Sequence, residues 1–170
     1  MKFSQNYNIR WHDTNANREL TPSAILTFMQ ETTNKHIQTI YPVIEYIRDE
    51  LHQAFILAKV YMRFYEPAHA YEDITVQTWT GIESRGFTFY RSFCVMRGET
   101  VIADALTTWC LVDTETHRLL PINKFENSFI NEESLKVDMP RKIKFPIDNK
   151  LEYIGKRKIV YSDIDYNKHM

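Results

Sequence analysis

The sequence predicts an α+β fold in which an antiparallel sheet wraps around one long central helix. The first observation behind this prediction is an unbroken helical pattern of apolar residues that begins after Thr21 and continues to Ile40. The second is a set of four runs rich in β-branched and aromatic residues that follow the helix. An alternating segment before the helix completes the order of one strand, one long helix and several long strands.

The first strand and the central helix are marked by periodicity and by capping residues. Residues 3–11 alternate loosely between apolar and polar side chains, as a strand does. Thr21 suits the helix N-cap, and Pro22 suits the first helical position, where its missing N–H costs no hydrogen bond. The expected buried face of the helix consists of Ile25, Phe28, Met29, Thr32, His36 and Ile40. Tyr41-Pro42 ends this helix, and a shorter helix is expected over residues 43–52.

The remaining strands are expected over residues 54–65, 73–80, 87–97 and 100–112. Glycine-containing turns separate the last three, which therefore form an antiparallel meander. Phe87, Phe89 and Phe93 alternate along one run and are expected to face the core. This order of elements is the plan of a hotdog fold. The alternative is an open α+β sheet with the helix lying across it, which differs mainly in how strongly the sheet curls.

Composition limits the classes of function. The chain of 170 residues has room for one ordinary domain and a remainder, and its formal net charge of -1 argues against nucleic-acid binding. No apolar run approaches the roughly 18 residues of a membrane helix, and the N-terminus lacks a signal-peptide pattern. Cys94 and Cys110 lie in apolar runs and are expected to be reduced and buried, so a soluble cytoplasmic protein is expected. No metal-ligand spacing or glycine-rich phosphate loop is present, so neither a metal nor a cofactor is expected.

The sequence also suggests a domain organisation. Residues 1–135 would form the first hotdog domain, whose last part (114–135) is polar and loop-like. Residues 136–158 carry eight basic and three acidic side chains and would be a basic linker, because Pro140 and Pro146 interrupt regular structure. This stretch is either a solvated linker or a docking surface for an acidic partner. Residues 159–170 would begin a second domain, with a new strand starting at Ile159-Val160-Tyr161.

The two ends of the chain resemble each other at an offset of 150 residues. Residues 9–19 (IRWHDTNANRE) match residues 159–169 (IVYSDIDYNKH). The isoleucine, the first aspartate and the asparagine near the end are identical, while Trp11 matches Tyr161, Asn15 matches Asp165 and Glu19 matches His169. The match predicts a duplicated domain, of which the second copy has only begun within these residues.

Three polar residues at alternate positions follow the strand expected from Ile159, and they are Asp165, Asn167 and His169. Their types suit hydrolysis of an activated acyl group. A carboxylate can orient an imidazole, a histidine can transfer a proton near neutral pH, and an asparagine can donate to a developing oxyanion. The alternative is a solvated turn in which the Asp and Asn side chains bind their own backbone.

A family resemblance bears on this choice. Residues 161–169 resemble the signature S-D-x-D-x-N-x-H of acyl-acyl carrier protein (acyl-ACP) thioesterases, which stands at the start of their second hotdog domain. The first 135 residues resemble the first domain of that family. The matching segments are Met29-Gln30-Glu31, Thr78-Trp79, Tyr90-Arg91-Ser92-Phe93 and Thr108-Trp109-Cys110-Leu111-Val112-Asp113.

The resemblance implies hydrolysis of fatty acyl-ACP thioesters, which releases free fatty acid and terminates fatty acid synthesis. It implies that Asp165, Asn167 and His169 are catalytic: Asn167 would hold the thioester carbonyl, His169 would transfer protons and Asp165 would orient its neighbours. The first domain would hold much of the acyl chain. Family members continue through a second domain with a further catalytic side chain, so the 170-residue chain by itself is expected to have little or no activity.

Two alternatives remain. The chain could be a single-hotdog, homodimeric acyl-CoA thioesterase that uses Asp13, although Glu19 stands where that reading needs a histidine. It could also be a non-catalytic acyl-binding domain. An unpaired hotdog domain would expose apolar surface and is expected to form a homo-oligomer. His36 is expected to be a packed core residue, and His12 a surface or turn residue.

Overall fold

The structure is a computed structural model of the whole chain and describes residues 2–40, 44–82, 84, 86–122, 131–138 and 152–164. The chain divides into two compact units, Met1–Met139 and Pro140–Met170, and each is described by itself. In the described part of the first unit the helices are α1 (Pro22–Gln38) and α2 (Ile44–Asp49). The strands are β1 (Phe3–Asn8), β2 (Gln53–Phe64), β3 (Asp73–Gly81), β4 (Phe89–Arg97), β5 (Thr100–Asp113), β6 (Leu119–Leu120) and β7 (Asn131–Glu132).

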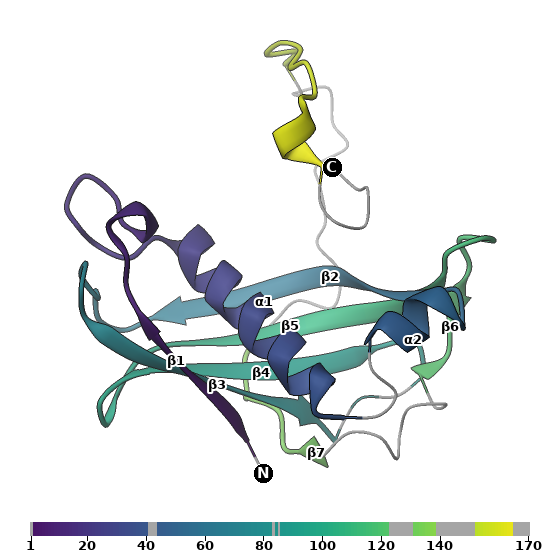
Figure 1. Cartoon of the computed structure of the whole chain (residues 1–170), viewed down its shortest axis with the longest axis horizontal. Coiled ribbons are helices and arrows are strands. Elements are labelled where there is room, and N and C mark those ends of the chain that lie inside the picture. Colours follow the sequence, from purple (N-terminus) through teal and green to yellow (C-terminus); the bar gives the residue numbers. More distant parts are fainter. Residues whose placement is uncertain are drawn as a thin grey trace. The chain divides into compact units, whose positions relative to one another are not determined.

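The sheet has the strand order β1-β3-β4-β5-β2, and all four of these pairings are antiparallel. The two-residue strands lie outside this path: β6 pairs with β5, and β7 pairs with β3 in parallel. Figure 1 shows α1 lying across one face of the sheet, followed by α2. A long helix held against an antiparallel sheet in this order is the hotdog fold, so the fold class predicted from the sequence is confirmed.

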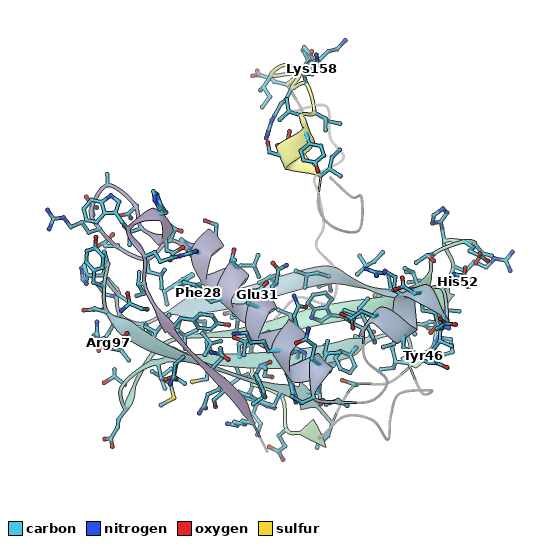
Figure 2. The ribbon with its side chains drawn as sticks, in the orientation of Figure 1. Phe28, Glu31, Tyr46, His52, Arg97 and Lys158 are labelled. Atoms are coloured by element: carbon cyan, nitrogen blue, oxygen red, sulfur yellow. The ribbon has the colours of Figure 1, made fainter. Side chains whose placement is uncertain are left out.

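The start of α1 forms as its sequence predicts. Thr21 has an extended backbone, its side-chain oxygen accepts a hydrogen bond from the N–H of Ala24 at 3.2 Å, and Pro22 occupies the first turn. The predicted face of the helix is buried, with the exception of its last member, Ile40, which is half-buried. Figure 2 labels two residues of this helix, of which Phe28 is buried and Glu31 is exposed to solvent.

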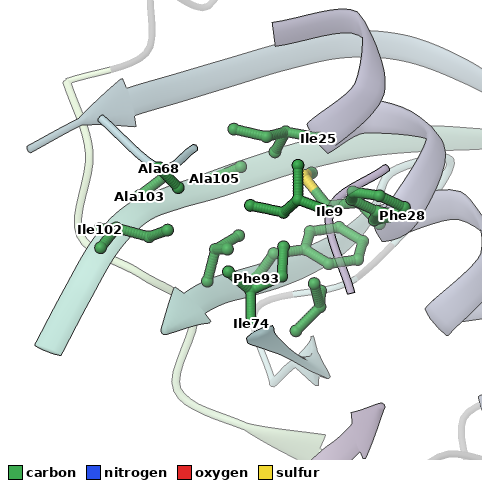
Figure 3. Close-up of a cluster of buried hydrophobic side chains, with 12 residues drawn as sticks. Ile9, Ile25, Phe28, Ala68, Ile74, Phe93, Ile102, Ala103 and Ala105 are labelled. Carbon is green, nitrogen blue, oxygen red and sulfur yellow. The ribbon is translucent and has the colours of Figure 1, made fainter. Parts of the chain in front are cut away.

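The main core lies between α1 and the sheet. Ile25 and Phe28 from the helix pack with Ile74 and Phe93 from the sheet, and Ile9 is also fully buried in this cluster (Figure 3). A second apolar cluster lies under α2 and consists of Ile47, Phe89, Leu111 and Ile122, with half-buried neighbours around them. The interior therefore contains two separate apolar regions.

The opposite face of the sheet is covered in part by residues 131–138. The indole Nε1 of Trp79 donates to the carbonyl oxygen of Glu133 at 2.8 Å, and the N–H of Leu135 donates to Oγ of Ser92 at 3.0 Å. Trp79 and Ser92 are buried as a result. Because both of these faces are buried at the centre of the sheet, β3 and β4 carry few exposed side chains.

Several sequence predictions are corrected in detail. Phe87 was expected in the core but is 51% exposed, because it lies in the turn before β4 rather than in the strand. The strands β6 and β7 were not predicted within residues 114–135, since a two-residue strand has no periodicity and exists only through its pairing partner. The strand expected from Ile159 is also wrong: the described residues of the second unit, 152–164, contain no strand, and Tyr161–Asp163 form a 3-10 turn.

No helix in the described ranges is both long and apolar enough to cross a membrane.

The importance of the main core can be tested with a matched pair of variants. Phe93→Ala, which removes a ring that is 1% exposed, should lower the free energy of unfolding by about 3 to 5 kcal/mol. Phe87→Ala, two residues before the same strand, should lower it by less than about 0.5 kcal/mol. Denaturant unfolding of both variants measures the difference, and equal losses would show that the two side chains are not buried differently.

Candidate functional site

A short capped turn connects β1 to α1. Trp11–Asp13 form one turn of 3-10 helix, and Asp13 is 6% exposed. Its Oδ2 accepts the backbone N–H of Arg10 at 2.9 Å and the Nε–H of the same residue at 2.9 Å, while Oδ1 accepts from Nη2 at 2.8 Å. These bonds to Arg10 hold the pKa of Asp13 below its usual value. Because both carboxylate oxygens are occupied and the group is a weakened base, the geometry favours a capping role for Asp13 over the catalytic role considered above.

The second unit repeats this capped turn. Tyr161–Asp163 form one turn of 3-10 helix, and Oδ2 of Asp163 accepts the backbone N–H of Val160 at 3.0 Å. The N–H of Asp163 donates to the carbonyl oxygen of Val160 at 2.9 Å, as the N–H of Asp13 donates to that of Arg10 at 3.0 Å. The carboxylate again carries a guanidinium partner, here Arg157.

The local backbone structure therefore repeats together with the sequence. The paired residues 150 positions apart share a turn type, a cap and a charge partner, although the arginine comes from a different position. This turn, and not a strand, is what the similarity between residues 9–13 and 159–163 encodes.

The loop that follows the first capped turn is closed by its own side chains. Oδ1 of Asn15 accepts the backbone N–H groups of Asn17 and Glu19 at 2.8 Å and 3.1 Å, and Nδ2 of Asn15 donates to Oε2 of Glu19 at 3.2 Å. Arg18 adopts a positive φ of 63°, which closes the loop tightly. The side chains of Asn15 and Glu19 therefore touch, and both Asn15 and Asn17 are exposed to solvent.

The predicted catalytic residues Asp165, Asn167 and His169 lie outside the described residues, so the structure does not test their arrangement. Asp13 and His12 lie in the first capped turn, where His12 is exposed as expected. Within the described ranges, no three His, Cys, Asp or Glu side chains are grouped so that they could hold a metal ion.

A buried polar group that was not predicted as a site separates the two apolar clusters. Arg91 on β4 is 1% exposed, and its Nη1 donates to Nδ1 of His36 at 3.0 Å and to Oγ1 of Thr78 at 3.2 Å. His36 is 4% exposed and stacks on the ring of Phe3, with ring centroids 5.1 Å apart. The expectation that His36 is a packed core residue is confirmed.

Burial decides the charge states of this pair. Burial lowers the pKa of His36 to about 4, and the positive charge of Arg91 acts in the same direction. Since a guanidinium can only donate, the bond between them requires an unprotonated Nδ1, so we assign the proton of neutral His36 to Nε2. Burial also lowers the pKa of Arg91 to about 9, which leaves the guanidinium charged at neutral pH.

Arg91 was quoted above only as part of a segment that resembles the family, but the sequence around it contains a local signal of a buried polar group. Phe89, Arg91 and Phe93 occupy alternate positions of one strand, so they share a face, and both phenylalanines are buried. A charged residue in the middle of an inward-facing alternation is the pattern that identifies a buried polar group.

Comparisons with known proteins were made against families, curated proteins and solved structures. Residues 1–126 match the family model of the acyl-ACP thioesterase N-terminal domain. Comparison with curated proteins gives no significant match.

Several solved structures share the fold. An acyl-ACP thioesterase from Bacteroides thetaiotaomicron superimposes with a TM-score of 0.81 and 19% identity, covering 98% of this chain and 67% of that one. The 12:0-ACP thioesterase from Umbellularia californica gives a TM-score of 0.82 and 19% identity, covering 99% of this chain and 65% of that one. A probable thioesterase from Escherichia coli, YbaW, gives a TM-score of 0.67 and 16% identity, covering 74% of this chain and 93% of that one. The chain thus spans about two thirds of the length of the two acyl-ACP thioesterases.

The pKa of His36 predicts a pH dependence of stability. In the unfolded chain His36 would bind a proton near pH 6.5, but in the folded protein only near pH 4, so the unfolded state binds more protons between these values. Stability should therefore fall as the pH drops from about 6.5 toward 4, by at most about 3 kcal/mol from this residue.

The variant His36→Gln keeps an acceptor for Arg91 but does not titrate, so it isolates the effect. Urea unfolding at a series of pH values gives the free energy of unfolding of both proteins. The wild-type value minus the variant value should fall as the pH drops, and this subtraction cancels the contributions of carboxylates such as Asp13. Parallel curves for the two proteins would contradict the assignment of a neutral, buried His36.

Proposed function

The chain belongs to the acyl-ACP thioesterase family, and from this membership we propose that it serves in hydrolysis of fatty acyl-ACP thioesters, which releases free fatty acid and ends fatty acid synthesis. The family match covers residues 1–126, and the hotdog fold of the first unit agrees with it. The enzyme class is thus a thioester hydrolase. We further propose a cytoplasmic location, which fits the absence of an apolar spanning helix in the described residues.

The observation that carries the site assignment is the repeated capped turn. Residues 15–19 begin two positions after Asp13, and residues 165–169 begin two positions after Asp163. In the first loop the side chains of Asn15 and Glu19 are hydrogen-bonded. The same relation in the second loop would join Asp165 to His169.

This pairing would give each residue of the second loop a chemical role. A carboxylate bound to an imidazole fixes its tautomer and supports its protonation during proton transfer, so Asp165 would orient His169. The exposed position of Asn17 in the first loop supports an outward-facing amide at Asn167, which could donate to the thioester carbonyl as negative charge develops on its oxygen.

The first loop does not have the chemistry proposed for the second. It places Asn15 where the second has Asp165, and Glu19 where the second has His169, so it lacks an imidazole. We therefore assign hydrolysis to the second loop and a structural role to the first, in agreement with the capping bonds of Asp13.

The partners in this proposal are an acyl chain, its carrier protein and a second hotdog domain. We propose that α1 and the sheet of the first unit receive the acyl chain and influence chain-length preference. The edge strand β2 exposes apolar side chains, with Ile56, Val60 and Phe64 between 39% and 50% exposed. This exposure supports the proposed homo-oligomer, because an edge strand with exposed apolar side chains tends to be buried against another protein chain.

Hydrolysis can test the site assignment with internal controls. In the full-length protein, Asn167→Ala and His169→Ala should each lower kcat/KM for a fatty acyl-ACP by about 100-fold or more. The matched variants of the first loop, Asn17→Ala and Glu19→Ala, should change it by less than about threefold. A larger loss in the first-loop variants than in the second would move the reaction to the first copy and overturn the assignment.

Carrier-protein docking can be tested on the basic stretch. Lys156 and Lys158 are exposed, and Lys158 is visible on the second unit in Figure 2, whereas Arg157 is bound to Asp163. The double variant Lys156→Glu/Lys158→Glu should raise KM for acyl-ACP several-fold and leave KM for acyl-CoA nearly unchanged. The control Arg118→Glu reverses another exposed charge and should leave both unchanged; an unchanged KM in the double variant would mean that the stretch is a solvated linker.

A further inference from the structure

Arg91 lies between the two apolar clusters of the interior, and no acidic residue of the described ranges is paired with it. On the helix-facing side of the sheet it is flanked by Thr80 on β3 and Thr107 on β5, and these three side chains are at most 1% exposed. Asp13 and Asp104 are the buried acidic residues in the part of the chain that is described. Asp13 is bound by Arg10, and Asp104 is bound by Arg63 and Tyr65 on the other side of the sheet, so neither balances the charge of Arg91.

The donors of Arg91 are only partly used. Nη1 has the acceptors His36 and Thr78, and the guanidinium lies over the ring of Phe89, with 5.9 Å between Cζ and the ring centroid. Nη2 is buried and has no hydrogen-bond acceptor among the described residues. A buried donor of this kind costs about 1 to 3 kcal/mol when it is left unsatisfied, and more when it is charged.

The described residues supply no acceptor for Nη2, so an oxygen atom of a bound molecule could complete its hydrogen bonds. A saturated acyl chain has no such atom, and packing its methylene groups against Nη2 would leave the donor unsatisfied. An acyl chain with a hydroxyl, oxo or carboxylate oxygen could accept from Nη2 and would gain a charge-assisted hydrogen bond in a dry environment.

We propose that Arg91 is the anchor of a buried subsite for an oxygen function on the acyl chain, so that this domain prefers oxygenated over plain acyl chains. This inference rests on the proposed acyl-binding role of the first unit. Arg91 would act as a specificity residue, with Nη2 as the donor and with His36 and Thr78 holding the guanidinium in place. It would take no part in hydrolysis.

The test uses amide-linked acyl pantetheine analogues, which have no thioester to hydrolyse. Plain chains of several lengths are compared by calorimetry with chains of the same lengths that carry one hydroxyl at successive carbons, or a terminal carboxylate. At least one oxygenated chain should bind about tenfold more tightly than its plain counterpart, which corresponds to one charge-assisted hydrogen bond. Arg91→Met keeps a long side chain of similar reach without donors and should remove this preference.

A measurement on the wild type guards against misfolding of the variant. In NMR spectra the Nη2 resonance of Arg91 should shift when the preferred oxygenated chain binds and should stay in place with the plain chain. Binding of plain chains with no preference for any oxygenated one would leave the proposed function intact and overturn this inference, as would a preference that survives in Arg91→Met. If no chain binds, the acyl-binding role itself fails.

Discussion

The buried guanidinium of Arg91 constrains the interior of the first unit. A charge removed from water is tolerated only where neighbouring groups supply acceptors in a fixed geometry. His36 must therefore stay neutral with Nδ1 free, and Thr78 must keep its hydroxyl oxygen within reach. Since these residues come from α1, β3 and β4, the polar contact fixes the helix on the sheet and separates the two apolar clusters.

The two capped turns share one structure, and we assign chemistry only to the loop that follows the second turn. A carboxylate at the third position of each turn closes it and binds an arginine, so Asp13 and Asp163 explain why an aspartate recurs after 150 residues. The residues after the turns differ in type, and only the second loop contains a histidine. The shared turn accounts for the similarity between the two segments, and our proposal that only the second loop acts in hydrolysis agrees with membership in the acyl-ACP thioesterase family.

The sequence predicts those parts of the fold that depend on local rules. The cap at Thr21, the buried face of α1 and the four long strands follow from periodicity and capping, and they are found within a few residues of the expected bounds. Features that depend on distant partners were missed, such as the pairing of β7 with β3 and the contact of Arg91 with His36, 55 residues away. The strand expected at Ile159 fails for the same reason, because apolar residues alone do not form a strand without a neighbour. For the site, the motif around His169 is found in the sequence through the family resemblance. The hydrogen bond between the side chains of Asn15 and Glu19, from which we infer the pairing of Asp165 with His169, could be seen only in the structure of the first loop.

We propose that the scaffold is duplicated and that the reaction belongs to the second loop, while the first unit holds the acyl chain. An experimental structure of the full-length protein with an amide-linked acyl-ACP tests it most directly. The account predicts that the amide carbonyl oxygen lies within hydrogen-bonding distance of the Asn167 side chain, with the acyl chain running along the helix-facing side of the sheet toward Arg91. A carbonyl bound instead beside Asp13 and the Asn15 loop would contradict it.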